Sequence, residues 1–155
     1  GRVRVVTMKT VLAAGVFDLL HYGHIRYLEE AKNAGGDSAR LIVIVARDET
    51  VRRLKGHGPI IPEDQRRAVI EALKVVDGAL LGHEEMDLIQ VIEQVKPDIV
   101  VMGHDQHGIK AQVEKVNQVL NADIEIVQLK QFGEDDLNST SKIKRRIVEG
   151  AGTPP

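Results

Sequence analysis

The stretch AGVFDLLHYGHIRYLEEAK, from Ala14 to Lys32, decides the fold of this chain. It begins inside an apolar run, Val11–Val16, that has the character of a buried strand. Apolar residues at helical spacing then predict a helix over His24–Ala34. His21 and His24 therefore lie at the joint between a strand and a helix, which is where an open α/β sheet binds its ligand.

The remainder of the chain repeats this alternation of apolar runs and helical patterns. Further strands are expected at Leu41–Ala46, Val76–Leu81, Ile99–Met102 and Ile124–Leu129. Further helices are expected at Pro62–Leu73, Met86–Val95, Lys110–Leu120 and Ser141–Val148. The alternation predicts a Rossmann-like, doubly wound α/β fold, in which a five-stranded parallel sheet has helices on both faces. The fourth strand should neighbour the first, across the point where the strand order reverses.

Composition limits the classes of function. The 155 residues suit one domain, expected over residues 8–150, with residues 1–7 a cloning remnant or an extended start and residues 151–155 a flexible tail. A net charge of −2 gives no basic field that would favour nucleic acid as a partner. The absence of cysteine excludes disulfides and thiolate metal sites. No apolar run approaches the roughly 20 residues that span a bilayer, and no signal peptide is recognisable, so we expect a cytoplasmic protein without a membrane partner.

Three interpretations of His21 and His24 are open from the residues alone. Two histidines three apart on one helix face can share a metal ion, but a catalytic zinc site needs a third protein ligand, and no spacing fixes one. Ordinary packing is the second interpretation. The third is a polyphosphate site, because a helix N-terminus presents free N–H groups to anions and Gly23 permits close approach. The position at the carboxyl end of the first strand favours the third interpretation.

The run Gly15-Val16-Phe17-Asp18, followed by His21-Tyr22-Gly23-His24, resembles the signature of the HxGH nucleotidyltransferases of the cytidylyltransferase-like superfamily. The resemblance covers roughly Lys9 to Val148. It implies transfer of a nucleotide from a nucleoside triphosphate to a phosphate acceptor, with His21 and His24 as catalytic residues. The residues of this stretch that it assigns to nucleotide binding are Val16, Phe17, His21, Tyr22, Gly23 and His24.

The same resemblance assigns single residues further along the chain. The basic segment Arg52–Gly56, expected in a loop, holds Lys55, the third catalytic residue that the resemblance implies. Arg66 matches a family arginine with either a phosphate-binding or a structural role. Asp105, after the fourth strand, is expected to bind the nucleotide. Phe132 either packs beside the base or belongs to the core.

The segment before the last expected helix resembles the Ser/Thr-rich motif that closes the nucleotide site of the superfamily. Its assigned residues are Ser139, Thr140 and Ser141, and they also suit a helix N-cap. Glu134 stands where the glycerol-phosphate cytidylyltransferases have an arginine that reads the base, which favours ATP over CTP.

Within the superfamily, LIVIVARDETVRRLKG (residues 41–56) followed by PIIPEDQR (residues 59–66) most resembles the archaeal FAD synthases. That resemblance implies ATP and FMN as substrates, FAD and pyrophosphate as products, and a homodimer. It also implies Mg²⁺ or another divalent cation held largely by the phosphates, with no metal-ligating residue of the protein. The alternatives are a cytidylyltransferase acting on glycerol 3-phosphate or a similar polar phosphate, a heptose-phosphate adenylyltransferase, and a nucleotide-sensing module without catalysis.

Overall fold

The computed structural model describes residues 8–83, 88–103, 107–130 and 139–150. The described residues form a five-stranded, wholly parallel sheet with the strand order β3-β2-β1-β4-β5. The strands are β1 (Thr10–Gly15), β2 (Arg40–Val45), β3 (Gly78–Leu81), β4 (Ile99–Met102) and β5 (Glu125–Gln128). The expected sheet is confirmed, and β4 does pair with β1, so the strand order reverses between these two strands.

The described helices are α1 (Tyr22–Ala34), α2 (Asp48–Lys55), α3 (Glu63–Glu71), α4 (Leu88–Val95), α5 (His107–Leu120) and α6 (Thr140–Gly150). Five of them overlap the helices expected from the sequence. The bounds differ by a few residues, because helix ends are set by caps that periodicity does not show.

Helix α2 contradicts the expectation that the basic segment Arg52–Gly56 is a loop. Asp48 and Glu49 occupy its first turn and basic residues its last, an arrangement that the helix dipole stabilises. Gly56 ends the helix with φ of +78°, a left-handed conformation that glycine adopts without strain. The charge pattern of this segment is that of a complete short helix and not of a solvated loop.

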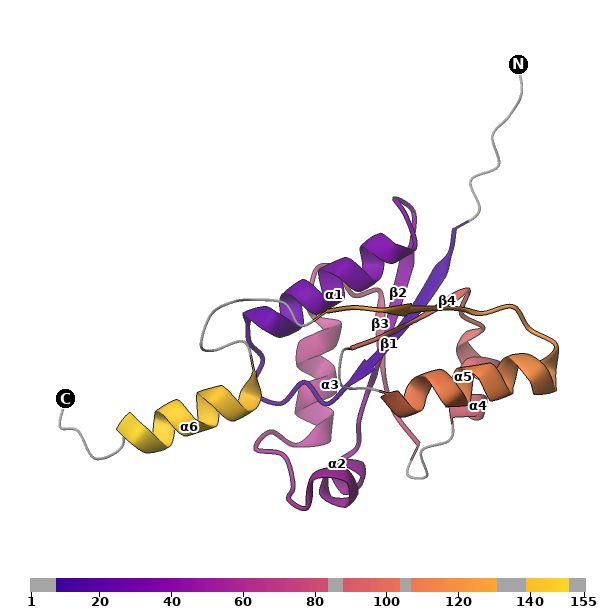
Figure 1. Cartoon of the computed structure of the whole chain (residues 1–155). Coiled ribbons are helices and arrows are strands. Elements are labelled where there is room, and N and C mark those ends of the chain that lie inside the picture. The colour runs from indigo at the N-terminus through magenta and orange to yellow at the C-terminus, as the bar shows by residue number, and fades with distance from the viewer. Residues whose placement is uncertain (1–7, 84–87, 104–106, 131–138, 151–155) are drawn as a thin grey trace.

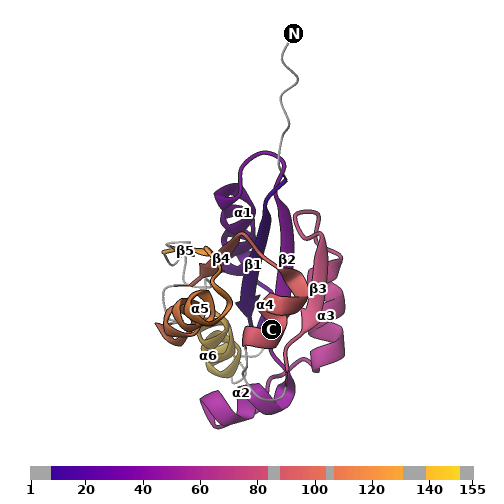
Figure 2. The same cartoon turned by 90° about the vertical axis from the view of Figure 1, so that its right-hand side faces the viewer.

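Helices cover both faces of the sheet (Figures 1 and 2). Helices α1 and α3 lie on one face, where Leu28 and Ile70 join a buried cluster with Val43 of the central strands. Helices α4 and α5 lie on the other face, where Val91 and Val113 join a second cluster with the alternate strand residues. Strand β2 has apolar side chains buried on both faces, which explains its continuous apolar run from Leu41 to Val45, β-branched from Ile42 onward.

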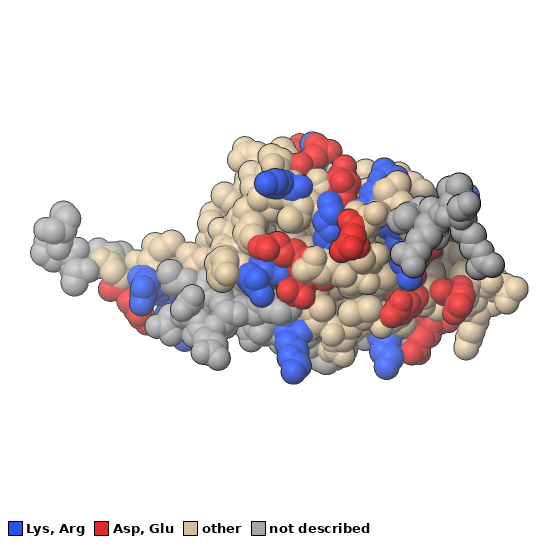
Figure 3. All heavy atoms as spheres, turned by 90° about the horizontal axis from the view of Figure 1, so that it is seen from above, with Lys and Arg blue, Asp and Glu red and all other residues tan. Residues whose placement is uncertain are grey.

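Helix α6 differs from the other helices in its packing. Figure 1 shows it extending away from the sheet, and none of its described residues is buried. Across the described residues, no helix combines the length and apolar character that crossing a membrane requires. Acidic and basic side chains are interspersed on the face of the molecule seen in Figure 3.

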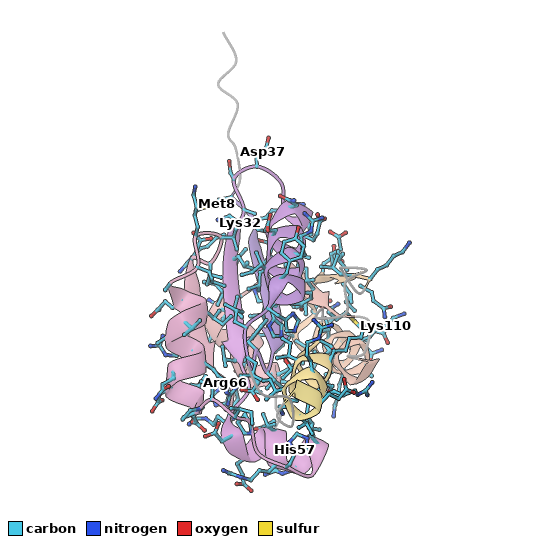
Figure 4. All side chains as sticks on the ribbon, turned by 90° about the vertical axis from the view of Figure 1, so that its left-hand side faces the viewer. Met8, Lys32, Asp37, His57, Arg66 and Lys110 are labelled. Atoms are coloured by element: carbon cyan, nitrogen blue, oxygen red, sulfur yellow. The ribbon has the colours of Figure 1, made fainter. Side chains whose placement is uncertain are left out.

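The carboxyl ends of the parallel strands meet at one edge of the sheet. Figure 4 shows Arg66 and His57 near this edge, with Met8, Lys32 and Asp37 at the opposite end of the molecule. The turn from β1 to α1, helix α2 and the loop after it all follow strands at the same edge. The assigned residues that belong to these described segments therefore lie at the edge where a sheet of this type binds its ligands.

Candidate active site

The turn between β1 and α1 has an unusual backbone. Phe17 and Leu19 have φ values of 55° and 50°, in the left-handed region that side chains other than glycine rarely adopt. The ring of Phe17 is buried and folds back over the end of β1. A Cβ atom at Gly15 would lie 2.8 Å from this ring, so only glycine fits there. The turn thus stores backbone strain beside the histidines, as functional turns often do.

The two histidines stand together at the start of α1. His21 is the N-cap residue, and the backbone N–H of His21 donates to Nδ1 of His24 at 3.2 Å. The two rings stack, with centroids 3.7 Å apart, and the ring of Phe17 meets His24 edge-on at 5.4 Å. Both imidazoles are therefore fixed beside the free N–H groups of the first helical turn.

His24 is a neutral hydrogen-bond donor in this arrangement. Its pKa is lowered from 6.5 to about 3, chiefly by burial and then by the positive charges of His21 and Lys55, while the carboxylate of Asp18 acts in the opposite direction. Because Nδ1 accepts the His21 amide, the single proton of the neutral ring lies on Nε2. Burial also lowers the pKa of His21. The site therefore offers an uncharged imidazole N–H to an incoming anion.

Asp18 joins the β1–α1 turn to the loop that follows α2. One carboxylate oxygen accepts the backbone N–H of Ile60 at 2.7 Å, and the other accepts that of Ile61 at 2.9 Å. Asp18 is 4% exposed, so these charge-assisted bonds are shielded from water. They fix the loop over residues 56–62 against the histidine-bearing turn.

The N-terminus of α6 lies against the same turn. The hydroxyl of Thr140 donates to the backbone carbonyl of Asp18 at 2.6 Å, although the two residues are 122 positions apart. Lys144 places its ammonium 3.8 Å from the Asp18 carboxylate. Ser139 accepts the backbone N–H of Lys142 at 3.2 Å, which confirms the expected N-cap. Two helix N-termini, those of α1 and α6, are thereby brought to one turn.

Lys55 is the last residue of α2 and is exposed, directly before the left-handed Gly56. Its positive charge contributes to the lowered pKa of His24, so the ammonium interacts electrostatically with the histidine pair. Lys55 therefore stands at the end of a helix rather than within a loop, directly before the loop whose later residues, Ile60 and Ile61, bond to Asp18.

Arg66 is committed to the protein itself. Its guanidinium is 1% exposed and donates to the backbone carbonyls of Ile61, Val16 and Ala46 at 2.7, 2.8 and 2.7 Å. It also forms an ion pair with Asp48 at 2.6 Å. Of the two roles expected from the sequence, the structure favours the structural one, because the guanidinium ties β1, β2 and the loop before α3 together and its donors are turned away from solvent.

A cavity of about 170 Å³ opens at the same edge, on the face of the sheet that carries α4 and α5. Its walls are mostly apolar and include Ala14, Val16, Ile44, Thr50, Leu54 and Ile109. Val16, expected to bind the nucleotide, therefore borders this cavity. Asp18 belongs to the signature quoted from the sequence but has no role assigned to it, and Thr50 carries no recognisable signal in the sequence. Only the structure identifies their contacts.

The remaining expected residues divide into two groups. Tyr22 is 60% exposed at the first turn of α1, and Gly23 and Ser141 lie in the first turns of α1 and α6. Asp105 and Phe132 lie outside the described residues. Within the described ranges no group of three or more histidine, aspartate or glutamate side chains is arranged to hold a metal ion, so the zinc interpretation of His21 and His24 finds no third ligand there.

Comparisons with known proteins agree with this geometry. A family model described as cytidylyltransferase-like matches residues 12–146. The FAD synthase of Aciduliprofundum boonei is 46% identical, with 92% of this chain and 92% of the relative covered. The FAD synthase of Methanopyrus kandleri is 47% identical, with 91% and 93% covered. A crystal structure from Thermoplasma volcanium, named a lipopolysaccharide core biosynthesis protein, superposes with a TM-score of 0.73 at 44% identity, over 82% of this chain and 100% of that one.

Proposed function

The chain belongs to the cytidylyltransferase-like family, and from that premise we propose that it transfers AMP from ATP to FMN, giving FAD and pyrophosphate. The similarity to FAD synthases over nine-tenths of the chain supports this substrate pair. The observation that carries the reaction type is the neutral imidazole N–H of His24 at the N-terminus of α1. Such an N–H donor stabilises the negative charge on the phosphoryl oxygens by a hydrogen bond, and the ring stays neutral.

The reaction needs no nucleophile from the protein. An ionised phosphate oxygen of FMN attacks the α-phosphorus of ATP and forms the new P–O bond. The bond from the α-phosphorus to the oxygen that bridges to the β-phosphorus breaks, and pyrophosphate leaves with that electron pair. Catalysis then consists of holding the two phosphates in line and stabilising the charge that spreads over the oxygens.

The described residues divide these tasks between them. His21 and His24 would hydrogen-bond the triphosphate, and the dipole of α1 favours its negative charge. Lys55 would neutralise charge on the transferred group and on the leaving pyrophosphate. The α6 N-terminus, anchored on Asp18, would contribute further N–H groups from Thr140 and Ser141.

A divalent cation, Mg²⁺ in the first place, would enter with the triphosphate. In the described part of the chain no cluster of carboxylates and imidazoles forms a cage for it, so its ligands would be phosphate oxygens and water. The ion would supply further neutralisation of phosphate charge. Asp105 follows β4 in the sequence, and β4 is the neighbour of β1 in the sheet, so Asp105 would bind the ribose. Phe132 would pack beside the base. A homodimer and a cytoplasmic location stay predictions, and light scattering on the purified chain tests the first.

The deciding experiment offers ATP or CTP together with FMN, glycerol 3-phosphate or heptose 1-phosphate. Pyrophosphate release is measured, and FAD is separated by chromatography. We expect FAD only from ATP with FMN. Product from CTP alone would reject this proposal in favour of a cytidylyltransferase. Nucleotide binding without pyrophosphate release in any combination would instead indicate a sensing module.

A further inference from the structure

Helix α2 carries Lys55 to the reaction centre, but little of the helix is embedded in the protein. Of its eight residues only Thr50 and Val51 are buried. The four residues from Arg52 to Lys55 are exposed. An isolated helix shorter than about 12 residues is marginal in water, so the direction of α2 depends on its contacts with the rest of the protein.

Glu63, the first residue of α3, supplies such a contact at the N-terminus of α2. One of its carboxylate oxygens accepts the backbone N–H of Asp48, the first residue of α2, at 2.9 Å. This N–H belongs to the first turn, where a helix has no partner of its own to offer. The preceding residue, Arg47, makes no side-chain hydrogen bond that caps α2, so a carboxylate from another helix takes the place of the usual N-cap side chain.

The second carboxylate oxygen of Glu63 holds Arg47. It accepts from Nη1 of Arg47 at 3.1 Å, while Nε of Arg47 donates to the backbone carbonyl of Gly82, directly after β3, at 2.6 Å. The Glu63 side chain is 23% exposed, so water only partly screens these bonds. Glu63 therefore ties the start of α2 to α3 directly and to the end of β3 through Arg47.

A contact at the start of α2 controls the position of its other end. From Asp48 to Lys55 the helix rises about 10 Å, so a tilt of about 10° at its N-terminus would move Lys55 by about 2 Å. A displacement of about 1 Å at a reacting centre can lower a rate about a hundredfold. After Gly56, the chain is next fixed where Ile60 and Ile61 bond to Asp18. The place of Lys55 is thus set from both ends, and Glu63 sets the first of them.

We propose that Glu63 is a positioning residue for nucleotidyl transfer, which acts through α2 to hold the ammonium of Lys55 beside the reacting phosphates. This inference rests on the proposed function, which gives Lys55 its role, and adds a residue outside the reaction centre that governs this role. Both oxygens of Glu63 have partners within the protein, so Glu63 touches neither substrate. Because it acts through Lys55 alone, its effect on turnover should vanish once the ammonium is removed.

The test is a double-mutant cycle between Glu63 and Lys55, with kcat measured by pyrophosphate release. Glu63→Ala should lower kcat about 3- to 10-fold, less than the loss of the ammonium itself, and leave both KM values within about twofold. In the Lys55→Ala background the same substitution should change kcat by less than about 1.5-fold. A merely structural role of Glu63 would lower kcat by the same factor in both backgrounds, and that result would overturn the inference.

A conservative variant and a matched control complete the test. Glu63→Gln keeps an oxygen that can accept the Asp48 N–H and should recover most of the wild-type rate, although it breaks the ion pair with Arg47. Asp64, the next residue of α3, is exposed and carries the same charge, so Asp64→Ala should leave kcat unchanged. In Glu63→Ala, hydrogen exchange should accelerate at the amides of α2 and stay slow at Val43 of β2. If Glu63→Gln is as slow as Glu63→Ala, the hydrogen bond to α2 is not what matters, and the inference is overturned.

The outcomes separate this inference from the proposed function. The cycle is measured with whichever donor and acceptor give pyrophosphate with the wild-type chain, so it decides the role of Glu63 even if the acceptor is not FMN. If Lys55→Ala keeps the wild-type rate, Glu63 has nothing to position, and the inference fails while FAD synthesis stands. A wild-type chain that transfers no nucleotide to any acceptor rejects the proposed function and this inference together.

Discussion

The backbone N–H of His21 donates to Nδ1 of His24 across 3.2 Å, and the two rings stack with centroids 3.7 Å apart. This relationship gives the backbone control of a side-chain proton, because an Nδ1 that accepts a bond leaves Nε2 as the donor. No carboxylate is needed to hold the tautomer. His24 lies three residues after His21 at the start of α1, and this spacing brings the ring of His24 to the backbone N–H of His21.

The first prediction concerns the protonation of His24. Its pKa of about 3 in the folded chain lies below the ordinary 6.5, because burial disfavours the imidazolium. Between these values the unfolded chain binds a proton here that the folded chain does not, so the free energy of unfolding falls as the pH decreases. NMR titration should find the ring neutral above about pH 4, and His24→Asn should weaken the pH dependence of stability. A ring that titrates near its ordinary value would contradict this arrangement.

The second prediction concerns the catalytic effect of the same ring. His24→Ala should lower kcat by about two to three orders of magnitude, the usual loss when one donor to a developing oxyanion is removed. Circular dichroism must show a folded variant. His57, exposed in the loop after α2, provides the control, and His57→Ala should turn over substrate close to the wild-type rate. A near-normal rate for folded His24→Ala would remove His24 from the mechanism.

The third prediction concerns Lys55. Lys55→Ala should lower kcat by about tenfold to a hundredfold, less than a buried donor, because water screens an exposed ammonium. Lys74 is also exposed but lies between α3 and β3, at the opposite edge of the sheet, so Lys74→Ala should leave the rate unchanged. Steady-state rates at two salt concentrations measure both variants. Equal losses in the two variants would mean that only overall charge matters.

The fourth prediction concerns Arg66. Its substitution leaves the carboxylate of Asp48 and several buried carbonyls without a donor, so Arg66→Met should lower the free energy of unfolding by about 3–5 kcal/mol. Arg67, one position later, pairs with Glu71 at the surface, and Arg67→Ala should cost less than about 1 kcal/mol. Urea denaturation compares the two. An Arg66→Met variant that is as stable as the wild type but has a raised KM for ATP would instead support the phosphate-binding role of Arg66.

The parallel sheet could be predicted from the sequence because its signal is local. Most strands are apolar runs, and β2 is β-branched from Ile42 to Val45 because both of its faces are covered. The pairing of β4 with β1 follows from the rules of doubly wound sheets and is confirmed. The N-cap at Ser139 also depends on neighbouring residues alone, and it too is confirmed.

Contacts between distant segments could not be predicted in the same way. Asp18 meets Ile60 across 42 positions and Thr140 across 122, and no periodicity encodes either contact. Arginine is usually exposed, but Arg66 is buried. Its burial is tolerated because backbone carbonyls accept from its guanidinium and Asp48 pairs with its charge. The sequence does not predict helix α2, because eight residues are too few to show a clear apolar period.

The last prediction concerns Asp18, which fixes the loop after α2 through both carboxylate oxygens. Asp18→Asn replaces one acceptor with an NH₂ group that faces a backbone N–H, so one of the two loop bonds is lost and the other weakened. Hydrogen exchange should accelerate at the amides of Ile60 and Ile61. Because the loop follows Lys55 directly, kcat should fall while the exchange of the buried β2 amides, such as Val43, stays slow. Uniformly faster exchange across β2 would show that Asp18 supports the whole fold rather than the position of the loop.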